Sequence, residues 1–232
     1  METNYTKWLA EQTRWSQELD EKHKKSLMMY LILIPIGSVA ALCALGLLAG
    51  GVDLAINNAK YGAIFGVVMD LFFLVIFLPA KPSRRYRKQI SKHIEAALPS
   101  QSEREAFAAQ MLGLDGEEAP QCISWHEKGI GEARVLVSRD YLLRTSGTGN
   151  ISLTPLRLLE QISLDARTST QTARGGDMKV KINTQYYTIG LQYQNVEKAT
   201  GLKKFFETEP ELIFESREIR DKVAQAIEKV RE

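Results

Sequence analysis

One carboxylate, Asp70, stands in the middle of an apolar run over residues 61–79. An acid near the centre of a membrane helix costs about 2.5 to 3.5 kcal/mol, and each Leu, Ile, Phe or Val returns about 0.3 to 0.6 kcal/mol. Enough apolar residues surround Asp70 for the helix to insert despite the acid. Three explanations stay open: a polar packing contact, a cation or proton path, and a shallow helix that leaves Asp70 in water.

A packing contact is the explanation that we favour for Asp70. Neither apolar run of the chain contains Lys or Arg, so an ionised Asp70 has no cation within the spans. The hydroxyl of Ser38, near the middle of the other run, is the candidate partner within the chain. Gly62 and Gly66 form a GxxxG spacing in the same run as Asp70. Small residues at this spacing let two helices approach closely, and the neighbouring helix is either the other run or a second copy of the chain.

Two apolar runs are long enough to cross a bilayer. Residues 27–50 carry no charged side chain, and a span needs about 20 residues. We expect this run to be a span and not a signal peptide, whose apolar core is about 7 to 15 residues long. Residues 61–79 are the second predicted span. Together they predict a transmembrane hairpin over residues 26–80.

Lysine and arginine flank the two spans unevenly, and these cations stay preferentially in the cytoplasm. The connecting segment carries only Asp53 and Lys60. Cations precede the first span and follow the second: Lys22, Lys24, Lys25, Lys81, Arg84, Arg85, Arg87, Lys88 and Lys92. We therefore expect a multi-pass protein of the inner (plasma) membrane with both termini in the cytoplasm. Residues 81–92 also allow another role, the sensing of anionic lipid headgroups.

The segment before the first span, residues 1–25, has the pattern of an amphipathic helix. Tyr5, Trp8, Trp15 and Leu19 recur at helical spacings, with charged residues between them. Tryptophan suits the headgroup region, where the ring is half-buried and its N–H stays wet. We expect Trp8 and Trp15 to lie at the membrane interface, with docking of this helix on the soluble domain as the alternative.

The remainder of the chain has the pattern of a mixed α and β domain. Residues 82–114 have a helical pattern, with Ser102 and Glu105 as a capping box. Seven or so short strands fit between residues 121 and 214. They include a pair around Arg139 and Asp140, and a pair on either side of a turn at 183–185. Ser216 is the expected cap of a last helix, whose apolar stripe covers the open side of a curved sheet. That stripe comprises Ile219, Val223, Ile227 and Val230.

These segments carry a family resemblance. A membrane hairpin followed by VLVSRDYLLRTS, ISLTPLRLLEQISL, alternating strands and a closing SREIRDKVAQAIEKV resembles the bacterial pleckstrin-homology-like (PH-like) membrane proteins. The likeness covers residues 121–232. It implies a partly open antiparallel β-barrel with a C-terminal helix, used as a binding or assembly module and generally without catalysis. An apparent extra helix in residues 195–210 departs from the simple form.

Signatures of catalysis are missing from the sequence. The glycine turns lack the Lys and Ser or Thr of a phosphate-binding loop, and no dinucleotide fingerprint follows a strand. His23, His93 and His126 are isolated, and Cys43 and Cys122 are too few and too distant for a thiolate metal site. We expect neither an enzyme nor a cofactor or metal, and the net charge of +2 does not favour a nucleic-acid partner.

The sequence thus predicts an α+β membrane protein and several functions for it. The favoured one is a scaffold or regulatory subunit in a homo-oligomer or membrane complex; a channel or transporter component using Asp70 and an anionic-lipid-sensing anchor are the alternatives. The expected parts are an amphipathic helix (1–25), the transmembrane hairpin (26–80), a juxtamembrane helical linker (81–118) and a PH-like cytoplasmic domain (119–232).

Overall fold

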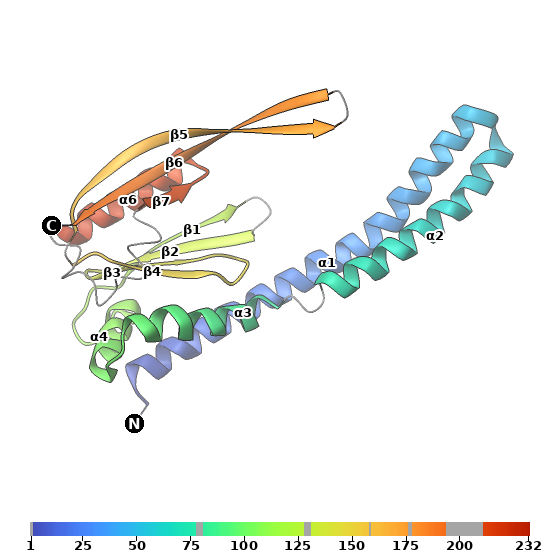
Figure 1. Ribbon diagram of the computed structural model, residues 1–232. Helices are drawn as coiled ribbons and strands as arrows, with labels where there is room; N and C mark the ends of the chain where they lie inside the picture. Colours follow the sequence, from blue (N-terminus) through green and yellow to red (C-terminus); the bar gives the residue numbers. More distant parts are fainter. Residues whose placement is uncertain (1, 78–80, 128–130, 158, 176–177, 194–210) are drawn as a thin grey trace. The chain divides into compact units, whose positions relative to one another are not determined.

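The computed structural model describes residues 2–77, 81–127, 131–157, 159–175, 178–193 and 211–232 (Figure 1). At residues 73, 76, 77, 171, 173–175, 178–180 and 182 the description covers the backbone alone. The chain forms two compact units. The helical unit comprises residues 14–83, and the mixed unit comprises residues 1–13 together with 84–232.

One helix, α1 (Asn4–Gly50), extends through 47 residues. The expected amphipathic helix (1–25) and first span (27–50) lie on one continuous helix, because no glycine or proline interrupts residues 20–34. Gly51 ends α1 with φ +83°, and α2 (Val52–Phe77) starts at the next residue. Most of the expected connection over residues 50–60 is therefore the beginning of α2. Of the described residues, α1 alone is long and apolar enough to cross a membrane by length and composition.

Three short helices begin the second part of the mixed unit. α3 (Pro82–Gln89) continues into a π-helix (Ile90–Glu95), and α4 (Gln101–Leu112) follows. Ser100 caps α4 and forms a complete capping box with Glu103, two residues before the predicted pair Ser102 and Glu105. The serine next to Pro99 takes the cap because its backbone is already extended, with φ −85° and ψ 149°.

The described strands form two antiparallel sheets, not a closed barrel. The first sheet has the order β1 (Gln121–Glu127), β2 (Gly131–Val137), β3 (Tyr141–Thr145) and β4 (Ile151–Pro155). The second has the order β5 (Leu159–Gly175), β6 (Met178–Tyr193) and β7 (Glu211–Phe214). The predicted strand pair around Arg139 and Asp140 is β2 and β3.

β5 and β6 are longer than the sequence pattern predicted. The expected turn at residues 183–185 is wrong, because Asn183 pairs with Thr170 and Gln185 with Thr168 inside a continuous ladder. A partner strand satisfies the backbone groups of Asn and Thr there, so no turn is needed. The expected extra helix over residues 195–210 lies outside the described residues.

The core of the mixed unit lies between the two sheets and the last helix, α6 (Arg217–Arg231). Val135 of β2, Ile189 of β6 and Val223 and Ile227 of α6 are fully buried in one cluster. The apolar stripe of α6 is therefore buried in the fold, as predicted, but it packs on two sheets and not on a single curved one. Ser216 lies at the N-cap, but its side chain makes no capping hydrogen bond.

Candidate functional site

The GxxxG glycines of α2 face the chain's own α1. A Cβ built on Gly62 would lie 2.9 Å from the carbonyl oxygen of Ser38, and one on Gly66 would lie 2.7 Å from the Cα of Pro35. Both distances are shorter than real Cβ contacts, so only glycine permits this approach of the two helices. The sequence left two neighbours open for this motif, the other apolar run and a second copy of the chain. The structure shows the other run, which lies on α1.

The same contact surface, which we call the seam, continues toward the turn between the helices. A Cβ on Gly46 would lie 2.5 Å from the Cα of Ala55. The thiol of Cys43 donates to the carbonyl of Ala55 at 3.7 Å. The seam therefore follows small residues on both helices, and α2 packs antiparallel to the second half of α1.

Asp70 lies on this seam. It follows Gly66 by one helical turn and Gly62 by two, so the three residues share a face. Gly66 lies opposite Pro35, and from one helical turn farther along both helices we infer that Asp70 lies at the level of Leu31. The Oδ1 atom of Asp70 is buried and has no hydrogen-bond partner among the described residues.

Ser38 is not the partner of Asp70. Its hydroxyl donates to the carbonyl of Ile34 at 2.8 Å, within its own helix, and it lies two turns away at the level of Gly62. Pro35 has no N–H, so the carbonyl of Leu31 lacks its usual helical donor. Asp70 and that carbonyl are thus two acceptors at one level of the seam.

The first turns of α1 belong to the core of the mixed unit. Trp8 is fully buried, stacks on Tyr5 with ring centroids 5.6 Å apart and meets Phe107 of α4 edge-on at 5.0 Å. Phe107 in turn packs edge-on against Tyr141 of β3 at 5.3 Å. The assignment of Trp8 to the membrane interface is corrected by this burial, whereas Trp15 is partly exposed.

A buried polar cluster joins the first turns of α1 to α3 and the first sheet. The Tyr86 O–H donates to Gln12 Oε1 at 2.8 Å, and Arg134 Nη2 donates to the same oxygen at 2.6 Å. Arg134 Nε also reaches Thr145 Oγ1 at 3.3 Å. Burial raises the pKa of Tyr86, which the nearby Arg134 guanidinium partly opposes. The cluster holds three separate segments in one arrangement.

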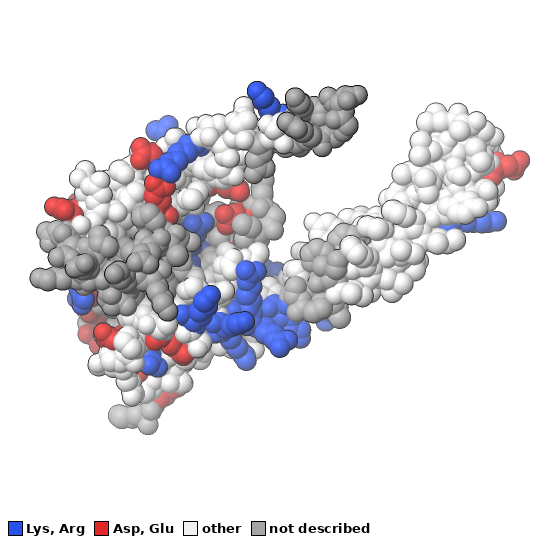
Figure 2. All heavy atoms as spheres, viewed as in Figure 1, with Lys and Arg blue, Asp and Glu red and all other residues white. Residues whose placement is uncertain are grey.

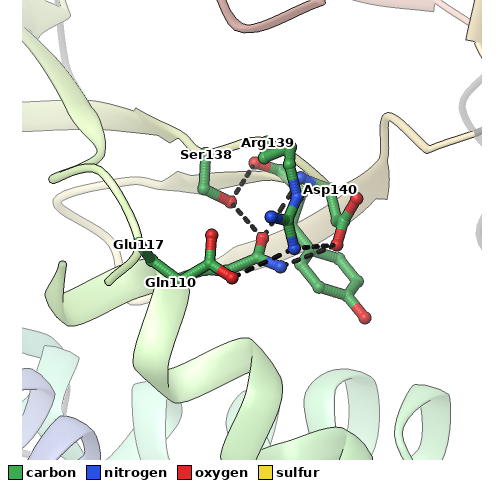
Figure 3. A network of polar contacts seen from close by, with 6 residues as sticks. Gln110, Glu117, Ser138, Arg139 and Asp140 are labelled. Carbon is green, nitrogen blue, oxygen red and sulfur yellow. Dashed lines mark hydrogen bonds and ion pairs between the residues drawn. The ribbon is translucent and has the colours of Figure 1, made fainter. Parts of the chain in front are cut away.

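A second polar network ties α4 to the turn between β2 and β3 (Figure 3). Gln110, which is buried, donates from Nε2 to Asp140 Oδ2 at 2.6 Å. Its Oε1 accepts from the Asp140 backbone N–H at 3.1 Å and from the Ser138 hydroxyl at 3.3 Å. Arg139 reaches out to Glu117 at 3.0 Å. The side chain of Gln110 thus forms hydrogen bonds with both ends of the turn, Ser138 and Asp140.

The predicted basic residues lie on one exposed segment. Figure 2 shows Lys and Arg gathered over α3. In this segment the exposed cations are Lys81, Arg84, Arg85, Arg87, Lys88 and Lys92. Elsewhere in the mixed unit, described arginines such as Arg139, Arg167 and Arg217 lie beside acids.

Sequence reasoning missed both polar networks. A signal for the first was present, because Gln12 falls on the same helical face as Tyr5 and Trp8, and a polar residue on an apolar face needs a partner. The sequence around Gln110 shows no comparable pattern that would predict a buried polar side chain. Within the described ranges, no group of three or more His, Cys, Asp or Glu could hold a metal ion.

Comparisons with protein-family models, curated proteins and solved structures find no match to this chain.

Proposed function

We propose that this chain is an integral membrane scaffold or regulatory subunit that presents a PH-like binding domain in the cytoplasm. The observation that carries the proposal is the distribution of exposed apolar side chains. Among the described residues, all the exposed large hydrophobic side chains except Leu164 and Ile213 lie on α1 or α2. Only 6% of the most apolar 18-residue stretch of α1 is buried. A bilayer is the solvent that suits such helices, because their backbone groups are paired internally.

Two further features support the arrangement proposed for the membrane. The cations lie before the first span and after the second, which favours cytoplasmic termini and a twice-spanning chain. The glycine seam supplies the close helix contact expected of two paired spans.

The mixed unit supports the PH-like part of the proposal. A four-stranded and a three-stranded antiparallel sheet enclose one core, and the C-terminal helix α6 covers it. Antiparallel sheets with a C-terminal helix are compatible with the PH-like domain that we propose. Such a domain acts by binding, which agrees with a role as a scaffold and not as an enzyme.

Assembly with further copies would use the outward face of α1. Gly62 and Gly66 are occupied by the chain's own seam, whereas a Cβ built on Gly37 would meet no atom within 4 Å. Three small residues farther along α1 are also exposed, namely Ala40, Ala41 and Ala44. Small residues on an exposed face let a second helix approach closely. We place the proposed oligomer contact on this face.

A channel or transporter component is the second candidate, and the unpartnered Oδ1 of Asp70 is the observation that favours it. Flux of cations or protons through proteoliposomes that disappears with Asp70→Asn is its expected result. Electrically silent proteoliposomes would exclude it.

Chemical cross-linking in native membranes tests the proposed assembly. We expect the full chain to form oligomers that Gly37→Leu weakens, because the larger side chain separates the outward faces. Ala63→Leu, an equally exposed change on α2, is the matched control and is expected to leave the oligomers intact. A strictly monomeric chain, or equal effects of both changes, would contradict the proposal.

A further inference from the structure

α3 and the π-helix after it present two opposite faces. Tyr86, Ile90 and Ile94 recur every four residues and are buried against the mixed unit. The remaining surface of the segment carries five exposed cations, which we call the cationic face: Arg84, Arg85, Arg87, Lys88 and Lys92. The helix therefore separates its apolar contacts from its charges.

The cationic face is held in place by the domain beneath it. Tyr86 is fully buried and donates to Gln12, which also accepts from Arg134. Ile90 and Ile94 add apolar contacts on the same side. Because the backbone of the segment is fixed, the five charges keep a common direction, and a partner does not have to order the helix on binding.

No counter-charge from the described chain neutralises this face. Residues 81–94 contain no Asp or Glu. None of the five cations forms an ion pair with a described residue, and the first acid after them, Glu95, accepts from the Tyr5 hydroxyl at 3.5 Å. Arg139, Arg167 and Arg217 of the same unit do have acidic partners. The cationic face therefore combines five neighbouring cations with no acid beside them among the described residues.

The cationic face follows α2 closely in the sequence. Arg84 follows Phe77, the last residue of α2, by seven positions, which an extended chain covers in at most about 25 Å. If α2 crosses the bilayer, as the proposed function requires, the face cannot lie far from the headgroups. Cytoplasmic leaflets are negatively charged, and clustered Lys and Arg are attracted to them.

We propose that the cationic face of α3 and the π-helix binds the headgroups of anionic phospholipids. Guanidinium groups form paired hydrogen bonds with phosphate oxygens, and ammonium groups act as point charges. This inference rests on the membrane location in the proposed function. It adds a partner, the anionic leaflet, and a consequence: the domain is held against the membrane by α3 as well as by the chain itself.

Native mass spectrometry of the full-length protein in detergent tests the proposal. Phosphatidylglycerol and phosphatidylcholine are titrated separately, and the bound lipids are counted. We expect phosphatidylglycerol to reach half-saturation at a concentration at least about tenfold lower than phosphatidylcholine does, since each cation contributes to the attraction. We also expect salt to reduce this preference. Equal binding of the two lipids would overturn the proposal.

Two matched variants locate the site. Changing the five cations of the face to Gln should abolish the preference, whereas exchanging Arg and Lys at the same positions should keep it. The control removes five exposed charges from other elements: Arg157, Lys181, Arg217, Lys222 and Lys229 to Gln. The assignment of the lipid site to the cationic face would be overturned in either of two cases. One is a preference for phosphatidylglycerol that survives the change of the five cations to Gln, and the other is an equal loss of that preference in the control.

Two further measurements separate the possible failures. Displacement of phosphatidylglycerol by millimolar inorganic phosphate would identify a free-phosphate site and overturn the lipid proposal; we expect no displacement. Alkaline carbonate washing of membranes reports on insertion alone. A chain that resists the wash but shows no lipid preference contradicts only this inference, and a chain that is washed off contradicts the proposed function.

Discussion

The two ends of α1 use apolar side chains in opposite ways. Near the start, Tyr5 is 9% and Trp8 0% exposed, because the two rings stack and Phe107 of α4 packs on Trp8. Farther along, Ile36 is 61% and Leu48 86% exposed. One continuous helix therefore contributes buried side chains to the core of the mixed unit and carries exposed apolar side chains farther along. Exposure within the fold, not helix length, distinguishes these roles.

The largest expected effect concerns the buried end of α1. Trp8→Ala should lower the free energy of unfolding of the mixed unit by about 3 to 5 kcal/mol, since it removes a fully buried indole packed on Phe107. Urea unfolding of the full chain followed by circular dichroism measures the loss. Trp15→Ala, at a partly exposed position, is the control and should cost less. Equal losses would show that the contrast along α1 is wrong.

The seam between α1 and α2 gives the next effect. Gly66→Leu should destabilise the helix pair by about 1 to 3 kcal/mol, because its side chain meets the backbone of Pro35. Pulsed EPR between labels at positions 36 and 64, in a background without the native cysteines, should show a wider separation. Gly37→Leu enters open space and should leave that distance unchanged. An unchanged distance in both variants would contradict the seam.

The network at Gln110 gives a comparable or smaller effect in the mixed unit. Gln110→Ala leaves the Asp140 N–H without its partner, at a cost of about 1 to 3 kcal/mol, whereas the Ser138 hydroxyl keeps the Tyr141 carbonyl as acceptor. Denaturant unfolding compares it with Gln161→Ala, an exposed glutamine of β5 that should change stability very little. Equal stability of the two variants would mean that the network does not support the turn.

The smallest effect is a pH dependence. Burial, followed by the nearby Glu95 carboxylate, raises the pKa of Tyr5 from 10.0 to about 12. A neutral tyrosine is thus favoured in the fold, so its stabilisation is complete below pH 10 and declines as pH rises toward about 12. In Tyr5→Phe the decline in unfolding free energy should be shallower. Some decline remains, because burial also raises the pKa values of Tyr86 and Tyr193. Identical slopes would contradict this role of Tyr5.

The sequence could predict those features of the fold that depend on residues close together along the chain. The stripe of α6 and the turn at Arg139 and Asp140 each depend on residues within a few positions of one another. The GxxxG motif is of the same kind, since its spacing alone places both glycines on one face. The capping box of α4 was predicted two residues too late.

Contacts between distant segments could not be predicted in this way. Asn183 and Gln185 have turn-forming character, and only the ladder with β5 makes them part of a strand. Gln12 and Arg134 are 122 positions apart, and their hydrogen bond depends on the whole mixed unit. Trp8 suits a headgroup layer and a core equally well, so its location was decided by Phe107 and not by its own neighbours.

Extraction of native membranes with alkaline carbonate tests the central claim, that the exposed apolar faces of α1 and α2 lie in a bilayer. Integral helices resist this treatment because their apolar surface has no other solvent. The account predicts that the full chain stays in the membrane pellet. Recovery of the chain in the supernatant would contradict it.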